Sequence, residues 1–421
     1  MSMIKNPVRG MRDFTPTEMG IRDYVLKIIE EVATSSGYQK IETPAVEHLE
    51  NLTGNDGGEN ESLIFRILKR SQDLEKAEES GDELSDSGLR YDLTVPLARF
   101  FSNNKQDITL PFKALQIGSV WRADRPQKGR FRQFVQCDLD ILGDDSILAE
   151  IDTISTIVNM LNRIFEGTKI SGITVNLNDR KILTAAARYA GFKEDDYSSI
   201  LIELDKIDKI GLSGVRDGLI KLNFDSQKVD TFINLFENLS GGIEVRQFCS
   251  KFGEFSPDDS VINDLEKILE TLEKLMKGNS KIIFDPTLVR GMGYYTGPIF
   301  ECSIEEFPSS IAGGGRYDNM IGKFDGGSSV SACGFSIGFE RVVSILEEVG
   351  FKPKTDKQMT AILVDKEISN EKLFEIFDRA EKMRAEGTVV SIISMNKNLG
   401  YQIEMLEKSG YTSFDKVYKD N

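Results

Sequence analysis

The spacing of apolar residues near the N-terminus predicts a helix followed by a short strand. Thr15 can cap the helix, and Glu18 can complete a capping box with it. Apolar residues then recur at intervals of three and four until Gly37 ends the pattern. Residues 38–42 are β-compatible and stop at Pro44. We therefore expect a helix with one buried face and a strand directly after it.

Further along the chain, two β-compatible segments, residues 112–121 and 132–142, are separated by a polar loop that contains glycine. This pattern predicts a long hairpin. Two more strands are expected at residues 281–285 and 298–304. By contrast, residues 71–87 are acidic, rich in serine and almost free of apolar residues, so we expect a solvated loop there.

Helical spacing of apolar residues appears in the middle of the chain, over residues 151–164 and 261–275. The residues between these two segments are mostly helix-compatible and carry no chemical motif. About residues 178–275 are therefore predicted to form an inserted helical subdomain. A later helix is expected from about Ser336 to Val349.

The pattern changes again near the C-terminus. After a linker at residues 351–358, the order is strand, helix, strand, helix, with room for one more short strand. This order predicts a small, separate α/β domain at residues 359–421. Residues 1–350 are expected to form the larger domain, so the predicted fold class is α+β.

Composition narrows the class of protein. The chain has 421 residues, and no stretch reaches the roughly 20 uninterrupted apolar residues that a membrane span needs. The N-terminal residues lack an apolar signal-peptide core, so we expect a cytoplasmic protein without membrane contact. The cysteines are widely spaced, which favours reduced thiols in the core. His48 is the single histidine and has no cysteine nearby, so no metal site is expected.

The net charge of −16 argues against a protein that binds nucleic acid over its whole surface. One local exception is the segment 118–132, which lies in the predicted hairpin. Its basic residues are Arg122, Arg125, Lys128, Arg130 and Arg132, and its one acidic residue is Asp124. A basic hairpin loop of this kind can close over a phosphate-bearing ligand.

Several segments that lie far apart in the sequence are dense in glycine, arginine, tyrosine and carboxylates. They are residues 88–99, 120–140, 285–301, 312–322 and 334–342. Each alone has an ordinary structural explanation, such as a turn or a surface ion pair. Together they fit the joining of a carboxylate to the α-phosphorus of ATP, because fixed guanidinium groups stabilise the charge that develops there. Carboxylates such as Asp92 and Asp140 can hold the ammonium group of an amino acid.

These segments resemble the signature motifs of histidyl-tRNA synthetases. VWRADRPQKGRFRQF (120–134) resembles motif 2 of that family, and GFSIGFERV (334–342) resembles its motif 3. LVRGMGYYTG (288–297) and AGGGRYD (312–318) resemble its two histidine-specific motifs. The resemblance implies a class II synthetase fold, in which an antiparallel-sheet catalytic domain carries a helical insertion. It also implies a shortened anticodon-binding-like α/β domain at the C-terminus.

The resemblance implies which residues contact ATP. Arg122 would bind the α-phosphate and the substrate carboxylate, and Arg341 would bind the γ-phosphate of a bent ATP. Asp124 and Arg130 would also contact the nucleotide, with Mg²⁺ sharing the phosphate charge. Arg290 matches the catalytic arginine of the family, so Arg290 and Arg122 are the expected catalytic residues.

The resemblance also implies a pocket for histidine. Its members would be Asp92, Thr94, Gln136, Asp140, Arg290, Tyr294, Tyr295 and Tyr317. Asp92 and Thr94 would contact the amino group, with Gln136 and Asp140 nearby. The tyrosine hydroxyls would face the imidazole ring, which both donates and accepts hydrogen bonds.

Contacts to tRNA and to a second subunit follow from the same resemblance. Arg125 and Gln127 match positions that, in the bacterial family, read the extra 5′ guanosine of histidine tRNA. The segment around Pro44 resembles motif 1, which implies a homodimer. Two features depart from the family: Gly293 stands where an aspartate is usual, and the C-terminal domain is short and carries little basic charge.

The sequence leaves three functions open. The first is a histidine--tRNA ligase, which forms histidyl-adenylate from histidine and ATP and passes the histidyl group to the 3′ end of tRNA(His). The second is a non-catalytic, histidine-sensing paralogue like the regulatory subunit of ATP phosphoribosyltransferase. The third is an adenylate-forming paralogue with an acceptor other than tRNA. The presence of Arg290, Tyr294 and Tyr295 favours the ligase.

Overall fold

The protein is described by a computed structural model over residues 3–53, 61–125, 131–237, 239, 242–291, 295–324, 327, 329–353 and 358–419. The chain divides into two compact units, Met1–Phe351 and Lys352–Asn421. Within the described ranges, no helix is long and apolar enough to cross a membrane.

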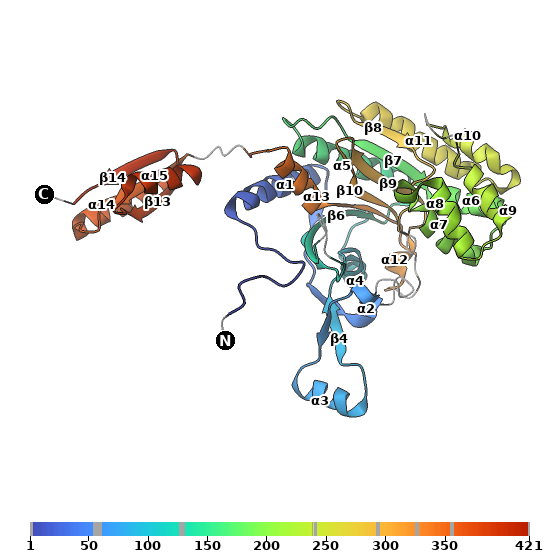
Figure 1. Cartoon of the computed structure of the whole chain (residues 1–421), viewed down its shortest axis with the longest axis horizontal. Helices are drawn as coiled ribbons and strands as arrows, with labels where there is room; N and C mark the ends of the chain where they lie inside the picture. Colours follow the sequence, from blue (N-terminus) through green and yellow to red (C-terminus); the bar gives the residue numbers. More distant parts are fainter. Residues whose placement is uncertain are drawn as a thin grey trace. The chain divides into compact units, whose positions relative to one another are not determined.

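The first unit is built on an eight-stranded sheet with the order β1-β5-β6-β11-β10-β9-β7-β8 (Figure 1). These strands are β1 (Gln39–Lys40), β5 (Phe112–Trp121), β6 (Gln133–Leu142), β7 (Thr174–Asp179), β8 (Lys281–Phe284), β9 (Pro298–Ile304), β10 (Phe307–Arg316) and β11 (Ala332–Ile337). β1 is parallel to β5 and β7 is parallel to β8, and every other neighbouring pair in the sheet is antiparallel. The predicted α+β class with a mainly antiparallel sheet is confirmed.

The predicted long hairpin provides the second and third strands, β5 and β6, in the order of this sheet. β5 and β6 pair along their whole length, from Phe112 opposite Leu142 to Trp121 opposite Gln133. Alternate residues of β6, including Cys137 and Leu139, are fully buried in the main core. All four cysteines of the chain are buried with free thiols, as expected.

Helix α1 (Pro16–Ser35) begins at the predicted capping box. The backbone N–H of Thr15 donates to Glu18 Oε2 at 2.7 Å, and Thr15 Oγ1 accepts from the backbone N–H of Glu18 at 3.4 Å. The helix packs against α5 (Leu148–Ile164) and α13 (Phe339–Glu348). The start expected for the last of these helices was wrong: Ser336 lies in β11, and the helix begins only after Gly338.

The helical insertion lies between β7 and β8 and adds to the main core. Its helices are α6 (Arg180–Tyr189), η2 (Glu194–Asp196), α7 (Tyr197–Leu204), α8 (Ile207–Lys221), α9 (Ser226–Asn234), α10 (Val245–Cys249), η3 (Ser250–Phe255) and α11 (Asp259–Leu275). The first two residues of the predicted range, 178 and 179, still belong to β7. Asp179 ends that strand and caps α6 by accepting from the backbone N–H of Lys181 at 2.7 Å.

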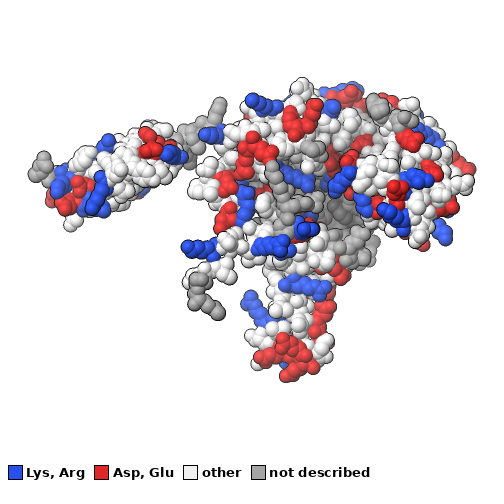
Figure 2. All heavy atoms as spheres, in the orientation of Figure 1, with Lys and Arg blue, Asp and Glu red and all other residues white. Residues whose placement is uncertain are grey.

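A separate arm extends from the same unit (Figure 1). It contains a three-stranded sheet with the order β2-β4-β3 and the α-helix between its last two strands. The elements are β2 (Val46–His48), α2 (Leu49–Thr53), η1 (Glu61–Leu63), β3 (Arg66–Leu68), α3 (Ser71–Ser80) and β4 (Ser85–Leu89). In Figure 2, Asp and Glu side chains cover the far end of this arm.

The solvated loop predicted for residues 71–87 was wrong. Most of α3 is exposed, and Ala77 is its one buried residue. Glutamate, lysine and alanine favour the helical backbone even without an apolar stripe. Gly81 caps the helix in the left-handed conformation at φ 75°. β4 is then fixed by pairing with two neighbours, which its polar composition did not reveal.

Two remaining short helices complete the first unit. α4 (Thr94–Asn104) begins at the last residue of the segment YDLT (91–94), and α12 (Asn319–Gly322) follows the AGGGRYD segment. The two helices contact one another, which brings these distant sequence motifs together.

The second unit has the predicted alternation of strands and helices. Its elements are β12 (Met359–Val364), α14 (Asn370–Ala385), β13 (Val389–Ser394), α15 (Leu399–Lys408) and β14 (Ser413–Val417). The three strands are parallel in the order β13-β12-β14, and the small core centres on Ile362 and Ile376.

Candidate active site

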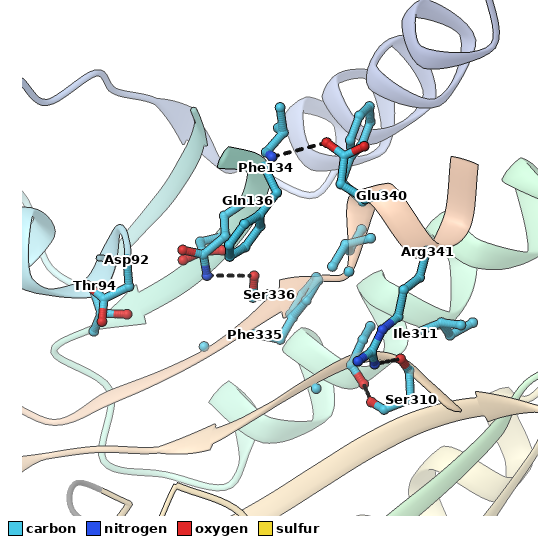
Figure 3. Close-up of a pocket in the computed structure, with 18 of the residues that line it drawn as sticks. Asp92, Thr94, Phe134, Gln136, Ser310, Ile311, Phe335, Ser336, Glu340 and Arg341 are labelled. Atoms are coloured by element: carbon cyan, nitrogen blue, oxygen red, sulfur yellow. Dashed lines mark hydrogen bonds between the residues drawn. The ribbon is translucent and has the colours of Figure 1, made fainter. Parts of the chain in front are cut away.

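A cavity of about 550 Å³ opens on the large sheet of the first unit (Figure 3). The predicted site residues that line it are Asp92, Thr94, Arg122, Asp124, Gln136, Asp140, Arg290, Tyr295, Tyr317 and Arg341. Arg125 is exposed and is not among the described residues that line the cavity. Gln127, Arg130 and Tyr294, and also Gly293, lie outside the described residues.

One strand, β6, supplies a row of hydrogen-bond acceptors to this cavity. Gln136, Asp138 and Asp140 alternate along the strand and all line the cavity. The amide of Gln136 donates from Nε2 to Ser336 Oγ of β11 at 3.2 Å, as Figure 3 shows. Its Oε1 and the Oδ1 of Asp138 are buried without a hydrogen-bond partner in the structure. A ligand rich in N–H donors, such as an ammonium group, complements this row.

Asp140 is the best-anchored of these acceptors. Its Oδ1 accepts a hydrogen bond from the hydroxyl of Tyr317 at 2.5 Å. Burial raises the pKa of Asp140 to about 7, and burial also raises the pKa of Asp138 well above its usual range. Gly334 lies opposite Asp140 in the sheet, and a Cβ there would meet Asp140 Oδ1 at 2.0 Å. Only glycine at this position leaves room for the carboxylate.

Replacement of Asp140 by asparagine should therefore change how stability depends on pH. Because its pKa is higher in the folded protein than in an unfolded chain, the folded state binds more protons between about pH 3.9 and 7. The free energy of unfolding of wild-type protein therefore falls as the pH rises from about 3.9 to about 7, and this loss is complete above pH 7. Relative to wild type, Asp140→Asn should gain up to about 3 kcal/mol in free energy of unfolding between pH 5 and 8, at about 1.4 kcal/mol per pKa unit.

The measurement is urea unfolding at both pH values, followed by the fluorescence of Trp121, the single tryptophan, which lies in the first unit. An equal stability difference at pH 5 and pH 8 would show that Asp140 is ionised in the folded protein throughout.

Arg122 is held in an aromatic cleft at the end of β5. Its guanidinium lies 4.2 Å from the ring centroid of Tyr91 and 5.2 Å from that of Phe134, and its Nε donates to the carbonyl of Tyr91 at 3.1 Å. The two rings and the carbonyl restrict the side chain, and its Nη groups can bind a carboxylate or phosphate.

The other two arginines meet at a distortion of β10. The register of β10 against β9 shifts between Phe307 and Ala312, and Ser310 lies in the shifted stretch. Arg341 Nη1 donates to the carbonyl of Ser310 at 2.5 Å, and Arg290 Nη1 donates to its hydroxyl at 3.4 Å (Figure 3 shows Ser310 and Arg341). One irregular residue thus contacts two cationic side chains that are far apart in the sequence.

The segment that carries Arg290 is itself anchored to the sheet. Asn178, at the end of β7, donates from Nδ2 to the carbonyl of Pro286 at 3.2 Å and to that of Leu288 at 3.0 Å. Leu288 and Val289 are buried. The backbone that precedes Arg290 is therefore held in place by β7.

Beside Arg341, Glu340 fixes the start of α13. It accepts two hydrogen bonds from Arg22 of α1, at 2.6 and 3.0 Å, and one from the backbone N–H of Val135 at 3.3 Å. The Arg22 guanidinium also lies 3.9 Å from the ring centroid of Phe14. This buried ion pair joins the first helix, the hairpin and the motif 3 segment at one edge of the cavity.

Sequence reasoning missed several residues of the site. Asp138, Glu340, Ser310 and Ser336 line the cavity but were not predicted. Asp138 could have been found, because period-two alternation from Gln136 puts it on the same face of β6. Ser310 gave no comparable signal, since its position depends on the register shift in β10.

Comparisons with known proteins agree with the motifs. The family model described as "Histidyl-tRNA synthetase" matches residues 10–342. The histidine--tRNA ligase of Leifsonia xyli subsp. xyli is 42% identical over 98% of this chain and 95% of its own length.

Two solved structures are similar in fold. A histidyl-tRNA synthetase from Nostoc sp. PCC 7120 has a TM-score of 0.77 and 26% identity, and the match covers 97% of this chain and 90% of that one. A Bacillus halodurans structure described as an ATP phosphoribosyltransferase regulatory subunit/histidyl-tRNA synthetase has a TM-score of 0.78 over the whole of both chains. At 23% identity, it shows the fold alone. The family model matches residues 10–342, and the Leifsonia ligase is similar over almost the whole of both chains. The chain therefore belongs to the histidyl-tRNA synthetase family.

Proposed function

We propose that this protein is a histidine--tRNA ligase that activates histidine with ATP and transfers it to tRNA(His). The observation that carries the proposal is the meeting of two kinds of group in one cavity. Arg122, Arg290 and Arg341 provide fixed cations, and the β6 row with Asp92 provides acceptors. The curated relative that is similar over 95% of its own length is named as such a ligase.

In the first step, a carboxylate oxygen of histidine attacks the α-phosphorus of ATP. A new oxygen–phosphorus bond forms, the bond to the bridging oxygen breaks, and pyrophosphate leaves. Arg122 and Arg290 stabilise the negative charge that develops on the α-phosphate, and Arg341 binds the γ-phosphate. These roles require fixed guanidinium groups, and each of the three has the anchoring contacts described above.

We infer that Mg²⁺ enters with ATP, because Mg²⁺ usually binds through substrate phosphates and one or two carboxylates. Among the described residues, no group of three or more His, Cys, Asp or Glu side chains could hold a metal by itself. Asp124 lies on the same segment as Arg122 and lines the cavity, so we assign it to the ion or the nucleotide. When bound, the ion would share the charge of the phosphates.

For the amino acid, we assign Asp92, Thr94, Gln136 and Asp140 to the amino-group side and Tyr295 and Tyr317 to the imidazole. Tyr295 and Tyr317 are buried, at 8% and 2% exposure, so their hydroxyls contact a ligand without much competition from water. Arg290 lines the same cavity, so we also assign it to the carboxylate of histidine. Tyr294 is proposed for the imidazole from its place in the motif alone.

The decisive test is histidine-dependent exchange between ATP and pyrophosphate, followed by charging of tRNA(His). Exchange with histidine and not with other amino acids is the expected result. Absence of exchange at saturating histidine, ATP and Mg²⁺ would contradict the enzyme. Exchange without charging would instead support the adenylate former with another acceptor, and histidine binding without exchange would support the regulatory-subunit alternative.

For the second step, we assign Arg125 and Gln127 to the acceptor end of tRNA. Arg125→Ala should lower kcat/KM for charging by about tenfold or more, since one specific arginine contact is worth roughly 1–3 kcal/mol. Pyrophosphate exchange should be unaffected, because Arg125 is exposed outside the cavity. Equal losses in charging and exchange would place Arg125 in activation instead of tRNA recognition.

We also propose a homodimer formed through the motif 1 region around Pro44, and a cytoplasmic location. Arg90 anchors this region to the hairpin, donating from Nη1 to the carbonyl of Thr43 at 2.7 Å and from Nε to that of Ser119 at 2.8 Å. Light scattering on the purified protein tests the dimer, and a monomer at micromolar concentration would contradict it.

A further inference from the structure

The position of Arg290 depends on a contact with the strand behind it. Arg290 Nη1 forms an ion pair with Glu301 of β9, and both side chains are about three-quarters buried, at 28% and 25% exposure. Arg290 lines the cavity, whereas Glu301 is not among the described residues that do. The cavity lining thus includes the guanidinium but not its carboxylate partner.

A glycine makes room for this contact. Gly313 of β10 is paired directly with Glu301 across the β9–β10 ladder. A Cβ on Gly313 would lie 2.5 Å from Arg290 Cζ and 2.7 to 2.8 Å from its two Nη atoms. The guanidinium thus occupies the space that a side chain at Gly313 would fill, and it lies next to Glu301, which pairs with Gly313 across the two strands. Sheet register, glycine and carboxylate together define one place for the arginine.

We propose that Glu301 is a positioning residue for Arg290, holding its guanidinium at the place where charge develops on the α-phosphate. The inference rests on the proposed function for the role of Arg290. A flexible arginine side chain has many rotamers, and a misplacement of about 1 Å can cost on the order of 10²-fold in rate. A charge-assisted ion pair in a partly buried site restricts that freedom.

The kinetic test compares two substitutions of Glu301 with a control. Glu301→Ala should lower kcat for histidine-dependent pyrophosphate exchange by about 10- to 30-fold, with KM for histidine and ATP within about threefold of wild type. Glu301→Gln keeps a hydrogen-bond acceptor and should restore the rate to within about threefold. The control is Asp205→Asn: this carboxylate of the helical insertion attracts Arg290 electrostatically. We expect that variant to stay within about threefold of wild type.

A double-mutant cycle decides whether Glu301 acts through Arg290. In an Arg290→Ala background, Glu301→Ala should cause no further loss of kcat. A further loss equal to that in the wild-type background would overturn the inference, as would wild-type kinetics in Glu301→Ala. If the melting temperature of Glu301→Ala shows that it folds poorly, Glu301→Leu takes its place in the same test.

A second measurement does not require turnover. Labelling by phenylglyoxal, followed by mass spectrometry of the peptide that contains Arg290, reports how firmly this guanidinium is held. Loss of the ion pair in Glu301→Ala should speed labelling of Arg290 by about threefold or more, and Asp205→Asn should not. Absence of exchange in the wild-type protein would contradict the proposed function, but it would not contradict the positioning of Arg290 by Glu301. An unchanged labelling rate would overturn the positioning role independently.

Discussion

Replacement of Arg290 by alanine is expected to lower kcat for histidine-dependent pyrophosphate exchange by about 10²- to 10³-fold, the usual cost of one group that stabilises a transition state. The side chain lines the cavity and is fixed by Glu301 and Ser310, so its charge is already in place when the α-phosphate becomes more negative. KM for histidine should change far less than kcat, because the β6 acceptors and the tyrosines are untouched.

Two further variants show whether the loss of rate in Arg290→Ala comes from the charge and shape of this side chain. Arg290→Lys keeps the charge but loses the planar fork, so its rate should lie between those of wild type and alanine. Arg163→Ala removes a surface arginine that pairs with Glu31 at 2.7 Å, and it should exchange at the wild-type rate. If Arg290→Ala raised only KM for histidine, Arg290 would be a binding residue and not a catalytic one.

Replacement of Glu150 by alanine should lower the free energy of unfolding by about 3 to 5 kcal/mol, the usual cost of removing one partner of a buried ion pair. Glu150 accepts from Arg316 Nε at 2.6 Å and from Nη2 at 2.8 Å, and its side chain is 1% exposed. The substitution removes the closer counter-ion of a buried guanidinium, which keeps only a 3.4 Å contact with Asp318. Activity should fall as well, because Arg316 directly precedes Tyr317, the partner of Asp140.

Urea unfolding followed by Trp121 fluorescence measures this loss in the first unit without interference from the second. The matched variant replaces Glu150 and Arg316 together with methionine, which leaves neither charge buried and should recover part of the stability. A loss below about 1 kcal/mol for Glu150→Ala would mean that water reaches Arg316 and solvates it.

Local patterns predicted the elements that depend on nearby residues. The capping box at Thr15, the β5–β6 hairpin and the strand and helix order of the second unit all follow from short spacings. The failure at residues 71–87 has the same origin, because a polar segment gives no local sign that two other strands will pair with it. Hydrophobic periodicity reports burial, and β4 is not held by a buried apolar face.

Most charged residues that line the candidate site were predicted, with the exceptions of Asp138 and Glu340, but the residues that fix them in place were not. Arginines that lie in recognisable motifs can be found from the sequence, whereas the residues that hold them in place come from distant parts of the chain. Arg22 and Glu340 are 318 positions apart. Glu301 supports Arg290 only because β9 pairs with β10 in a register that puts Gly313 opposite it. No spacing along the sequence specifies such a pairing.

The place of β11 in the sheet has a consequence during translation. β11 forms hydrogen bonds with β6 on one side and β10 on the other, yet it is the last of these eight strands to leave the ribosome. A nascent chain that ends before Ala332 has two unpaired strand edges where the finished protein has a closed ladder. Such edges pair readily with other chains, so products of premature termination in this region should aggregate or require a chaperone. Completion of β11 closes both edges at once and brings Ser336 to the candidate-site cavity in the same step.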